Sequence, residues 1–321
     1  MTNDFNKELS AHAPSLADAL GVRPGITSII KNNLADSLGV RPGITAIIGS
    51  GGKTSLMRAL SRQLSANGSR VLLTTTTHIL PFKDLPCLRI SMKEDASWVL
   101  DKLAEIDSHV GCSSLSEIDL HAGCGSLSEI DLHAGCDSLS GIKTPVREIC
   151  FGSGLLPDCS AGFVKSFEGS SLEDAPFNPK LSEPGFPLYE LLPGADYIFA
   201  EADGARHHYM KAHAHYEPVI PERCGRTILV IGAQGFGMRV SEAVHRPETF
   251  CRLTGTRLED IVTPALYAEF LRREIEGGLA FDCILLNGVD CERCCDLSEE
   301  FAAAFAGCFG GPVVFADLPL A

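Results

Sequence analysis

The sequence lacks the features that mark nucleic-acid-binding, membrane-spanning or secreted proteins. Basic residues are scarce, because 27 Lys and Arg stand against 41 Asp and Glu and leave a net charge of −14. A polyanion partner requires basic patches that displace counterions, so this charge argues against nucleic acid and anionic lipid surfaces. No apolar run reaches about 18 residues, the length of a membrane span, and residues 1–8 do not resemble a signal peptide. We therefore expect a cytoplasmic protein.

Paired metal-ligand spacings are also lacking, although the chain has 13 cysteines. A twelve-residue tandem at residues 111–142 brings cysteines and histidines together, but its Cys-to-His gap of nine exceeds the roughly two to five residues usual in zinc-ligand pairs. We interpret the tandem as an expanded surface loop, with metal binding as the alternative. The C-x-x-C-C at residues 291–295 has no second pair and is a poor predictor of a metal site by itself. The tandem residues concerned are Cys112, Cys124, Cys136, His121 and His133.

The chain does have an apolar stretch, residues 44–48, that breaks into glycines, then Lys53 and Thr54, then a helical pattern. Glycines let backbone N–H groups turn towards one anion, and the following helix adds its positive N-terminal end. This order predicts a phosphate-binding loop for a nucleoside triphosphate, with Lys53 at the outer phosphates and the Thr54 hydroxyl on Mg²⁺. The predicted loop comprises Gly49, Ser50, Gly51, Gly52, Lys53, Thr54 and Ser55.

The loop departs from the usual G-x-x-x-x-G-K-[ST] spacing, because Ile47 stands where the first glycine would fall. The alternative interpretation is a glycine-rich turn that happens to contain Lys-Thr. The odd number of cysteines and a nucleotide-type loop together favour reduced thiols over a secreted disulfide framework.

Four threonines and His78 follow the next predicted strand, residues 70–73. Ligands of open α/β sheets bind at the carboxyl ends of strands, so we expect Thr75, Thr76 and Thr77 to line the site. The alternative is that these threonines only extend the strand, because threonine favours β structure.

Two acidic residues, Glu201 and Asp203, end the apolar stretch 195–200. A P-loop enzyme keeps the acidic group that holds its magnesium at such a strand end. Either carboxylate could take the metal and leave the other to orient water. We therefore predict Lys53, Glu201 and Asp203 as catalytic residues and Thr54, Glu201 and Asp203 as metal ligands. The alternative is a strand-end turn with solvated carboxylates.

Further candidate residues lie in the second half of the chain. The proline-bounded loop 211–221 follows the acidic strand, and its Lys211 and Glu217 could bind substrate or nucleotide. His245 and Arg246 open a predicted helix, where Arg246 could clamp a phosphate or serve only in a capping turn. The histidines of residues 207–215 make metal capture conceivable, but no cysteine or carboxylate stands at a fixed offset from them.

An N-x-x-D sequence, Asn287 to Asp290, ends the apolar stretch 281–286. In guanine-nucleotide proteins an Asn-Lys-x-Asp at such a strand end lets the Asp carboxylate accept both N–H groups of guanine's edge. Gly288 replaces the lysine here, so both ATP and GTP remain open as cofactors.

The domain organisation follows from a duplication and an irregular region. Residues 16–30 recur as 34–48 with 13 of 15 positions identical, and only the second copy leads into the glycines. We interpret residues 1–33 as an accessory extension and 34–321 as one domain with a variable insertion at about 105–193. The predicted fold is an α/β three-layer sandwich, similar to P-loop NTPases, around a mostly parallel sheet.

In combination, these blocks resemble one family, the selenium-dependent hydroxylase accessory proteins of the YqeC type, also called selenium cofactor biosynthesis proteins. The resemblance covers about residues 40 to 316 in motif order. The duplication, the tandem, Gly288 and the histidines at 213 and 215 depart from the family pattern. The blocks are residues 49–56, 71–79, 200–206, 211–221, 244–248 and 285–290.

The resemblance implies a P-loop NTPase-like protein that helps selenium-dependent molybdenum hydroxylases to mature. We expect it to bind Mg²⁺ with ATP or GTP and to couple hydrolysis or phosphoryl transfer to selenium insertion into the hydroxylase or its cofactor. The alternative is a nucleotide-gated chaperone or scaffold for the apo-hydroxylase without significant turnover. A third hypothesis, an ATP-dependent ligase, rests on the short loop.

Overall fold

The computed structural model describes residues 26–27, 33–82, 84–90, 94–108, 146–153, 162–164 and 180–319. The residues of the tandem lie outside these ranges, as does nearly all of the predicted extension 1–33. No helix in the described ranges is long and apolar enough to cross a bilayer.

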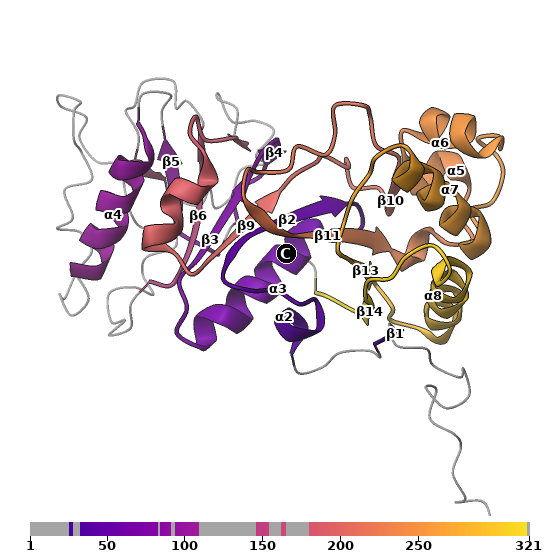
Figure 1. Cartoon of the computed structure of the whole chain (residues 1–321), viewed down its shortest axis with the longest axis horizontal. Coiled ribbons are helices and arrows are strands. Elements are labelled where there is room, and N and C mark those ends of the chain that lie inside the picture. Colours follow the sequence, from indigo (N-terminus) through magenta and orange to yellow (C-terminus); the bar gives the residue numbers. More distant parts are fainter. Residues whose placement is uncertain are drawn as a thin grey trace, which may run out of the picture.

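A mostly parallel sheet forms the centre of the molecule, as the sequence predicts (Figure 1). Its strand order is β1-β14-β13-β11-β2-β9-β3-β6-β5-β7, with β8 pairing with β6 and β4 pairing with β8. Only the pairings of β7 and β8 are antiparallel in the described part of this sheet. The strands of this sheet are β1 (Ile26–Thr27), β2 (Gly43–Gly49), β3 (Val71–Thr75), β4 (His78–Ile79), β5 (Cys87–Ile90), β6 (Glu148–Ser153), β7 (Gly162–Val164), β8 (Leu181–Ser182), β9 (Tyr197–Glu201), β11 (Cys224–Gly232), β13 (Cys283–Asn287) and β14 (Val313–Ala316).

Helices cover both faces of the sheet, because its central strands are apolar on both sides. Ile47 packs with Leu56 and Leu60 of α3 on one face. Its neighbours Ala46 and Ile48 pack on the opposite face with residues of α6, α7 and α8. The helices are α2 (Leu34–Ser37), α3 (Lys53–Ala66), α4 (Ala96–Ser108), α5 (Val240–Ala243), α6 (Pro247–Thr254), α7 (Pro264–Glu276) and α8 (Glu292–Phe305), with 3₁₀ turns η3 (Leu188–Gly194) and η4 (Ala233–Gly235).

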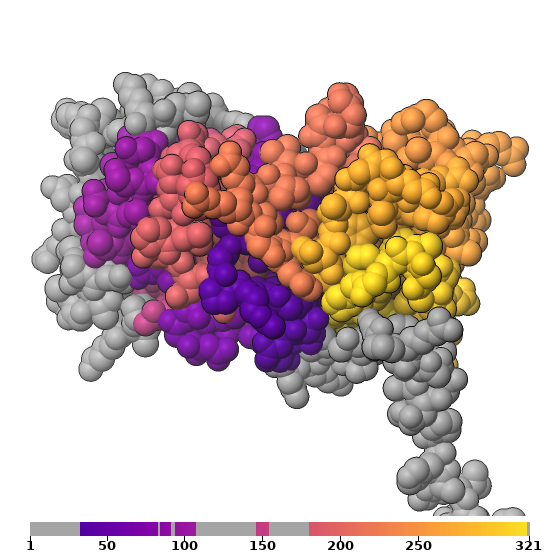
Figure 2. Space-filling view, in the orientation of Figure 1, coloured from indigo at the N-terminus to yellow at the C-terminus, as the bar shows by residue number. Residues whose placement is uncertain are grey.

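The second face is divided along its length between two groups of helices. α4 and η3 cover the half that contains β3, β5 and β6, and α6 to α8 cover the half that contains β11 and β13. Figure 1 shows α4 at one end of the sheet and α8 at the other, and in Figure 2 the indigo surface of the α2 and α3 region lies between the magenta and yellow halves. A two-stranded sheet of β10 (Met210–Lys211) and β12 (Val244–His245) lies apart from the main one.

The first copy of the duplicated segment contributes a short edge strand. Residues Ile26–Thr27 form β1, which pairs in parallel with Val313 and Val314 of β14. The matching positions of the second copy, Ile44 and Thr45, lie in β2 at the centre of the sheet. Only the second copy has glycines after it, so only this copy forms a strand that ends in the predicted phosphate loop.

The insertion predicted at about 105–193 contains regular elements in its described parts. β6 begins at Glu148 and joins β3 and β5 in the parallel part of the sheet. η3 packs against α4 in the apolar cluster on the second face. The described parts of the insertion therefore belong to the regular structure of the domain.

Candidate functional site

The predicted phosphate loop lies at the carboxyl end of β2 and turns directly into α3. Gly49, Gly51 and Gly52 all have positive φ, and a Cβ atom on Gly49 would lie 2.2 Å from the carbonyl oxygen of Val230. Glycine is therefore required for the close approach of this loop to β11. Gly52 is the N-cap of α3 and provides no capping side chain. The first-turn amides of α3 lack intrahelical acceptors, so they are available to an anion.

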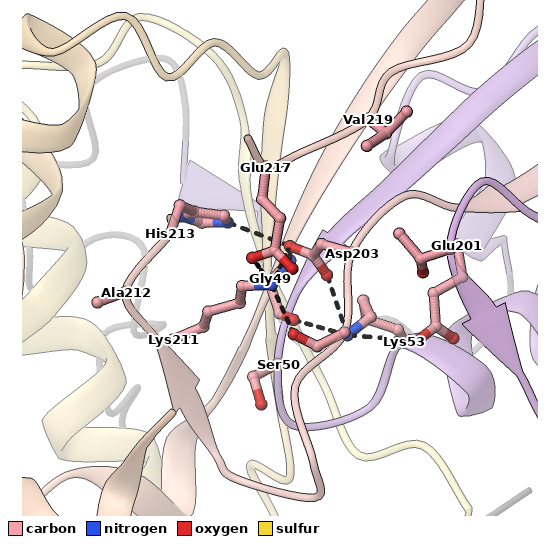
Figure 3. Close-up of polar contacts among 12 residues, drawn as sticks. Gly49, Ser50, Lys53, Glu201, Asp203, Lys211, Ala212, His213, Glu217 and Val219 are labelled. Atoms are coloured by element: carbon pink, nitrogen blue, oxygen red, sulfur yellow. Dashed lines mark hydrogen bonds and ion pairs between the residues drawn. The ribbon is translucent and has the colours of Figure 1, made fainter. Parts of the chain in front are cut away.

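Lys53 folds back over the loop and contacts both predicted acidic residues (Figure 3). Its Nζ donates to the carbonyl oxygen of Gly49 at 2.7 Å and lies 3.1 Å from Asp203 Oδ1 and 3.5 Å from Glu201 Oε1. Burial alone would lower the pKa of Lys53, but the two carboxylates outweigh it and raise the pKa above its ordinary value. The structure thus brings together the three residues predicted to be catalytic.

Asp203 is fully buried and serves as the common partner of the site. Its Oδ2 accepts from the Gly49 amide at 2.8 Å and lies 3.1 Å from His213 Nε2 and 3.3 Å from Lys211 Nζ. Burial alone would raise the pKa of Asp203, but Lys53, His213 and Lys211 hold it well below its ordinary value. Asp203 therefore stays ionised and holds the glycine loop against the cations.

Glu201 lies in a different electrostatic environment, although it is only two residues away. It ends β9, where it pairs with Ile47 of β2 and with Thr75 of β3. The hydroxyl of Thr54 donates to Glu201 Oε2 at 3.4 Å. Burial raises the pKa of Glu201, and the attraction of Lys53 does not cancel this effect. The two carboxylates are thus shifted in opposite directions, as in pairs that divide acid and base roles.

The predicted threonines lie beside Glu201 at the end of β3. Thr75 Oγ1 donates to the Glu201 carbonyl oxygen at 2.9 Å and accepts from the Thr77 amide at 2.9 Å. Thr76 Oγ1 donates to the carbonyl oxygen of Val219 at 2.6 Å. These hydroxyl groups of Thr75 and Thr76 connect β3 to β9 and to the loop after β10.

Lys211, Glu217 and Arg246 extend the charged network away from the phosphate loop. Lys211 Nζ lies 2.8 Å from Glu217 Oε2, which also lies 2.6 Å from Arg246 Nη1. Burial lowers the pKa of Lys211, although Asp203 and Glu217 oppose this effect. Lys211 therefore connects the residues predicted for substrate binding to Asp203.

His245 lies on β12, directly opposite Lys211 of β10. Its ring stacks on that of His208 at a centroid distance of 5.7 Å. Burial, followed by the positive charge of Arg246, lowers the pKa of His245 to about 4, so its imidazole is neutral near pH 7. The Ser50 hydroxyl of the phosphate loop donates to the backbone carbonyl oxygen of His208.

Asn287 and Asp290, the residues predicted to read a base, have different surroundings. Asn287 Nδ2 donates to the carbonyl oxygen of Gly51 at 2.8 Å, and its Oδ1 accepts from the Leu318 amide at 3.0 Å. Asn287 therefore fixes the phosphate loop to the end of β13. Asp290 is exposed three residues further on, beside Cys291 and Cys294.

The sequence interpretation did not assign His213 and Glu274 to this site. His213 Nδ1 lies 2.9 Å from Glu274 Oε2, and the His213 amide donates to Glu274 Oε1 at 2.8 Å. Burial opposes protonation, but Asp203 and Glu274 raise the pKa of His213 to about 9. A buried glutamate on the otherwise apolar face of α7 was the one available signal, because buried carboxylates are nearly always paired.

Comparisons with known proteins agree with this arrangement of motifs. Residues 45–123 and 179–248 match the sequence profile of the YqeC protein family, and these two stretches include the phosphate loop, both acidic residues and Arg246. The chain belongs to the YqeC family. The resemblance stated from the motifs is confirmed by this match.

A relative in Escherichia coli (strain K12), named uncharacterized protein YqeC, is 29% identical over 212 residues. These residues make up 64% of this chain and 59% of the relative, so the chain spans less than two thirds of that protein. No solved structure matches the chain.

Proposed function

We propose that this YqeC-family chain binds a Mg²⁺-nucleoside triphosphate at residues 49–55 and hydrolyses it or transfers its phosphoryl group. The observation that supports this proposal most directly is the loop itself: a glycine N-cap leaves the first amides of α3 uncapped, and Lys53 lies over the loop between two acidic residues. The amides and the ammonium group can bind the negative charges of a triphosphate, and the carboxylates can bind its cation.

The donors present suit magnesium. Thr54 and Glu201 offer a hydroxyl and a carboxylate oxygen 3.4 Å apart, and Mg²⁺ prefers oxygen ligands. Asp203 is less suited to bind the metal directly, because its Oδ2 already faces the Gly49 amide, Lys211 and His213. When bound, Mg²⁺ would neutralise charge that develops on the phosphates. We assign Thr54 and Glu201 to the metal and Asp203 to positioning Lys53.

As a metal ligand, Glu201 would hold the cation beside the phosphates of the bound nucleotide. Lys53 would stabilise negative charge on the outer phosphates at the same time. Because both groups are buried and fixed by Gly49 and Thr54, they need little reorganisation when the reaction occurs.

Calorimetric titration with ATP and GTP, with and without Mg²⁺, tests the binding. We expect Lys53→Ala to weaken triphosphate affinity by roughly 10- to 100-fold, since it removes a charge-assisted contact. Thr54→Val should weaken affinity only when Mg²⁺ is present. Lys102→Ala is the matched control, because Lys102 pairs with Glu105 on α4. Equal loss in the control and in Lys53→Ala would contradict the assignment.

Phosphate release over many cycles separates an enzyme from a nucleotide-gated scaffold. We expect Glu201→Gln to bind triphosphate without Mg²⁺ as the native chain does and to lose turnover, because glutamine keeps the size of the side chain but removes the charge that holds Mg²⁺. Tight binding without turnover in the unsubstituted chain would favour the scaffold. An acyl-phosphate formed on a carboxylate substrate would favour the ligase.

We further propose that this nucleotide chemistry assists selenium insertion into a molybdenum hydroxylase. This step rests on the family resemblance of the sequence blocks and not on a contact of the site. The selenium content and activity of the hydroxylase, produced with the native chain or with Lys53→Ala, test it. Equal selenium content in both would overturn this role without affecting nucleotide binding.

A further inference from the structure

A second group of ligating side chains, Asp290, Cys291 and Cys294, lies between β13 and α8. One oxygen and two sulfur atoms of these residues all lie within 4.8 Å of one another. Cys291 is the N-cap of α8, and Cys294 lies in its first turn. Residues three apart share one side of a helix, so the helix start places the two sulfur atoms together.

Two residues of the cluster are open to solvent, and the third is held in place by packing. Asp290 and Cys291 are exposed, whereas Cys294 is buried and packs against the apolar cluster under α6 to α8. The guanidinium group of Arg293 approaches Gly237, where its Nη2 would lie 2.2 Å from an added Cβ atom. The one cation within the C-x-x-C sequence therefore extends towards the loop after η4.

We propose that Asp290, Cys291 and Cys294 bind a thiophilic divalent cation of the zinc class, with one coordination position left open. Two thiolates and a carboxylate are ligands that zinc accepts, and zinc sites with three protein ligands keep a fourth position for water or a substrate. Magnesium prefers oxygen donors alone, so this site differs in metal class from the one at Thr54 and Glu201. Binding would release the thiol protons of Cys291 and Cys294 to solvent.

The site lies at the same edge of the sheet as the phosphate loop. Asn287 lies three residues before Asp290, and its Nδ2 donates to the carbonyl oxygen of Gly51 at 2.8 Å. Gly288, between Asn287 and Asp290, packs against Gln234 of η4. The proposal does not depend on nucleotide binding, because none of the three ligands contacts the loop. It does compete with base reading by Asp290, since a carboxylate bound to a cation is not available to a purine edge.

Titration of the reduced full-length chain with Co²⁺, without oxygen, tests the site. All proteins in this titration carry Cys112→Ser, Cys124→Ser and Cys136→Ser, which remove the thiols of the tandem, and this triple variant is the background chain. We expect one equivalent of Co²⁺ to produce a thiolate-to-cobalt absorption band, and zinc to displace the cobalt because zinc binds such sites more tightly. Cys308→Ser, an exposed cysteine beyond the end of α8, is the matched control and should leave the band unchanged.

The ligand variants decide the assignment. Cys291→Ser and Cys294→Ala should each abolish the band, and Asp290→Asn should lower affinity by on the order of tenfold or more. Cys291 is exposed, so its variant gives a clear answer even if Cys294→Ala does not fold. A band that persists in Cys291→Ser would overturn the proposal, and so would the absence of any band in the background chain. Formation of a Cys291–Cys294 disulfide with glutathione disulfide, without metal affinity, would replace the site by a redox dithiol.

Discussion

At the scale of single residues, Asp203 is the point on which the charges of the site converge. It contacts two lysines, a protonated histidine and the amide of Gly49 while fully buried. A buried carboxylate is stable only when such partners compensate its lost hydration. The same contacts that stabilise Asp203 also fix the ammonium group of Lys53 near the phosphate loop.

The protonation of His213 gives this network a predicted pH dependence. The folded pKa of His213 is about 9 against an ordinary value of 6.5, and its side chain is only 6% exposed. A raised pKa contributes stability that is fully present below about pH 6.5 and is lost as the pH rises through about 9. We expect His213→Gln to destabilise the chain at pH 6, and the difference from the native chain to shrink by about 3 kcal/mol by pH 10.

Urea unfolding from pH 6 to pH 10 measures this difference. The matched control is His215→Gln, because His215 is exposed two residues further along the same loop. The control should follow the pH dependence of the native chain. A His213→Gln difference that stays constant across the range would show that His213 is not protonated between Asp203 and Glu274.

Some residues of the site could be predicted from sequence and others could not, for a physical reason. Lys53, Glu201 and Asp203 follow apolar stretches at strand ends, and parallel strands bring such ends to one edge of the sheet. Their mutual contacts were therefore foreseeable. Glu274 lies on the third helix after the site, and no local pattern reveals which buried side chain a helical glutamate faces.

At the scale of elements, the turn from β2 into α3 depends on close contact between Gly52 and Asn287 of β13. Gly52 has a φ of 138°, and a Cβ atom there would lie 2.2 Å from Asn287 Nδ2. We expect Gly52→Ala to displace Asn287 from the Gly51 carbonyl oxygen and to lower triphosphate affinity by at least roughly tenfold, since it removes a hydrogen bond that shapes the loop. Calorimetry and thermal unfolding measure the two effects.

Gly68→Ala separates the clash from backbone strain. Gly68 also has positive φ, but a Cβ atom there would meet no neighbour within 4 Å. Its substitution should cost about 1 kcal/mol of stability and leave affinity unchanged. If both variants bind nucleotide equally, the contact between Gly52 and Asn287 does not shape the loop. Adding Asn287→Ala to Gly52→Ala should relieve the clash and recover part of the stability.

Regular elements with strong local patterns were predictable, and short ones in the insertion were not. The sequence predicts strands at β3, β9 and β13, and the structure confirms them. η3 lies in the region interpreted as irregular, where prolines mask a short helical pattern, whereas α4 begins before that region, at Ala96. β1 depends on pairing with β14, more than 280 residues away in sequence, and a two-residue strand has no local pattern.

At the scale of the whole molecule, the site joins the helical layers on the two faces of the sheet. Lys53 belongs to α3, which packs on one face, whereas Glu274 belongs to α7 on the other. The chain of contacts from Lys53 through Asp203 and His213 to Glu274 therefore passes from one helical layer to the other at the carboxyl edge of the strands. Ligand binding at Lys53 should stabilise both layers together.

The predicted domain boundary at residue 33 implies that residues 1–32 contribute little to stability or to triphosphate binding. In the part of residues 1–32 that the structure describes, only the two residues of β1 pair with the sheet. We expect removal of residues 1–32 to change the free energy of unfolding by about 1 kcal/mol and to leave triphosphate affinity within about twofold, because few backbone hydrogen bonds are lost. Urea unfolding and calorimetry on the shortened chain measure both quantities.

A second truncation, which also removes residues 33–40, provides the comparison. It deletes α2 together with Leu38 and Val40, which are buried against α3 and β2. Burial of one such side chain is worth about 1.5 to 3 kcal/mol, so this truncation should lose at least about 3 kcal/mol. Because α3 begins at the phosphate loop, its affinity for triphosphate should fall as well. If the two truncations are equally destabilised, the domain begins before residue 33 and the first copy of the duplication is part of its core.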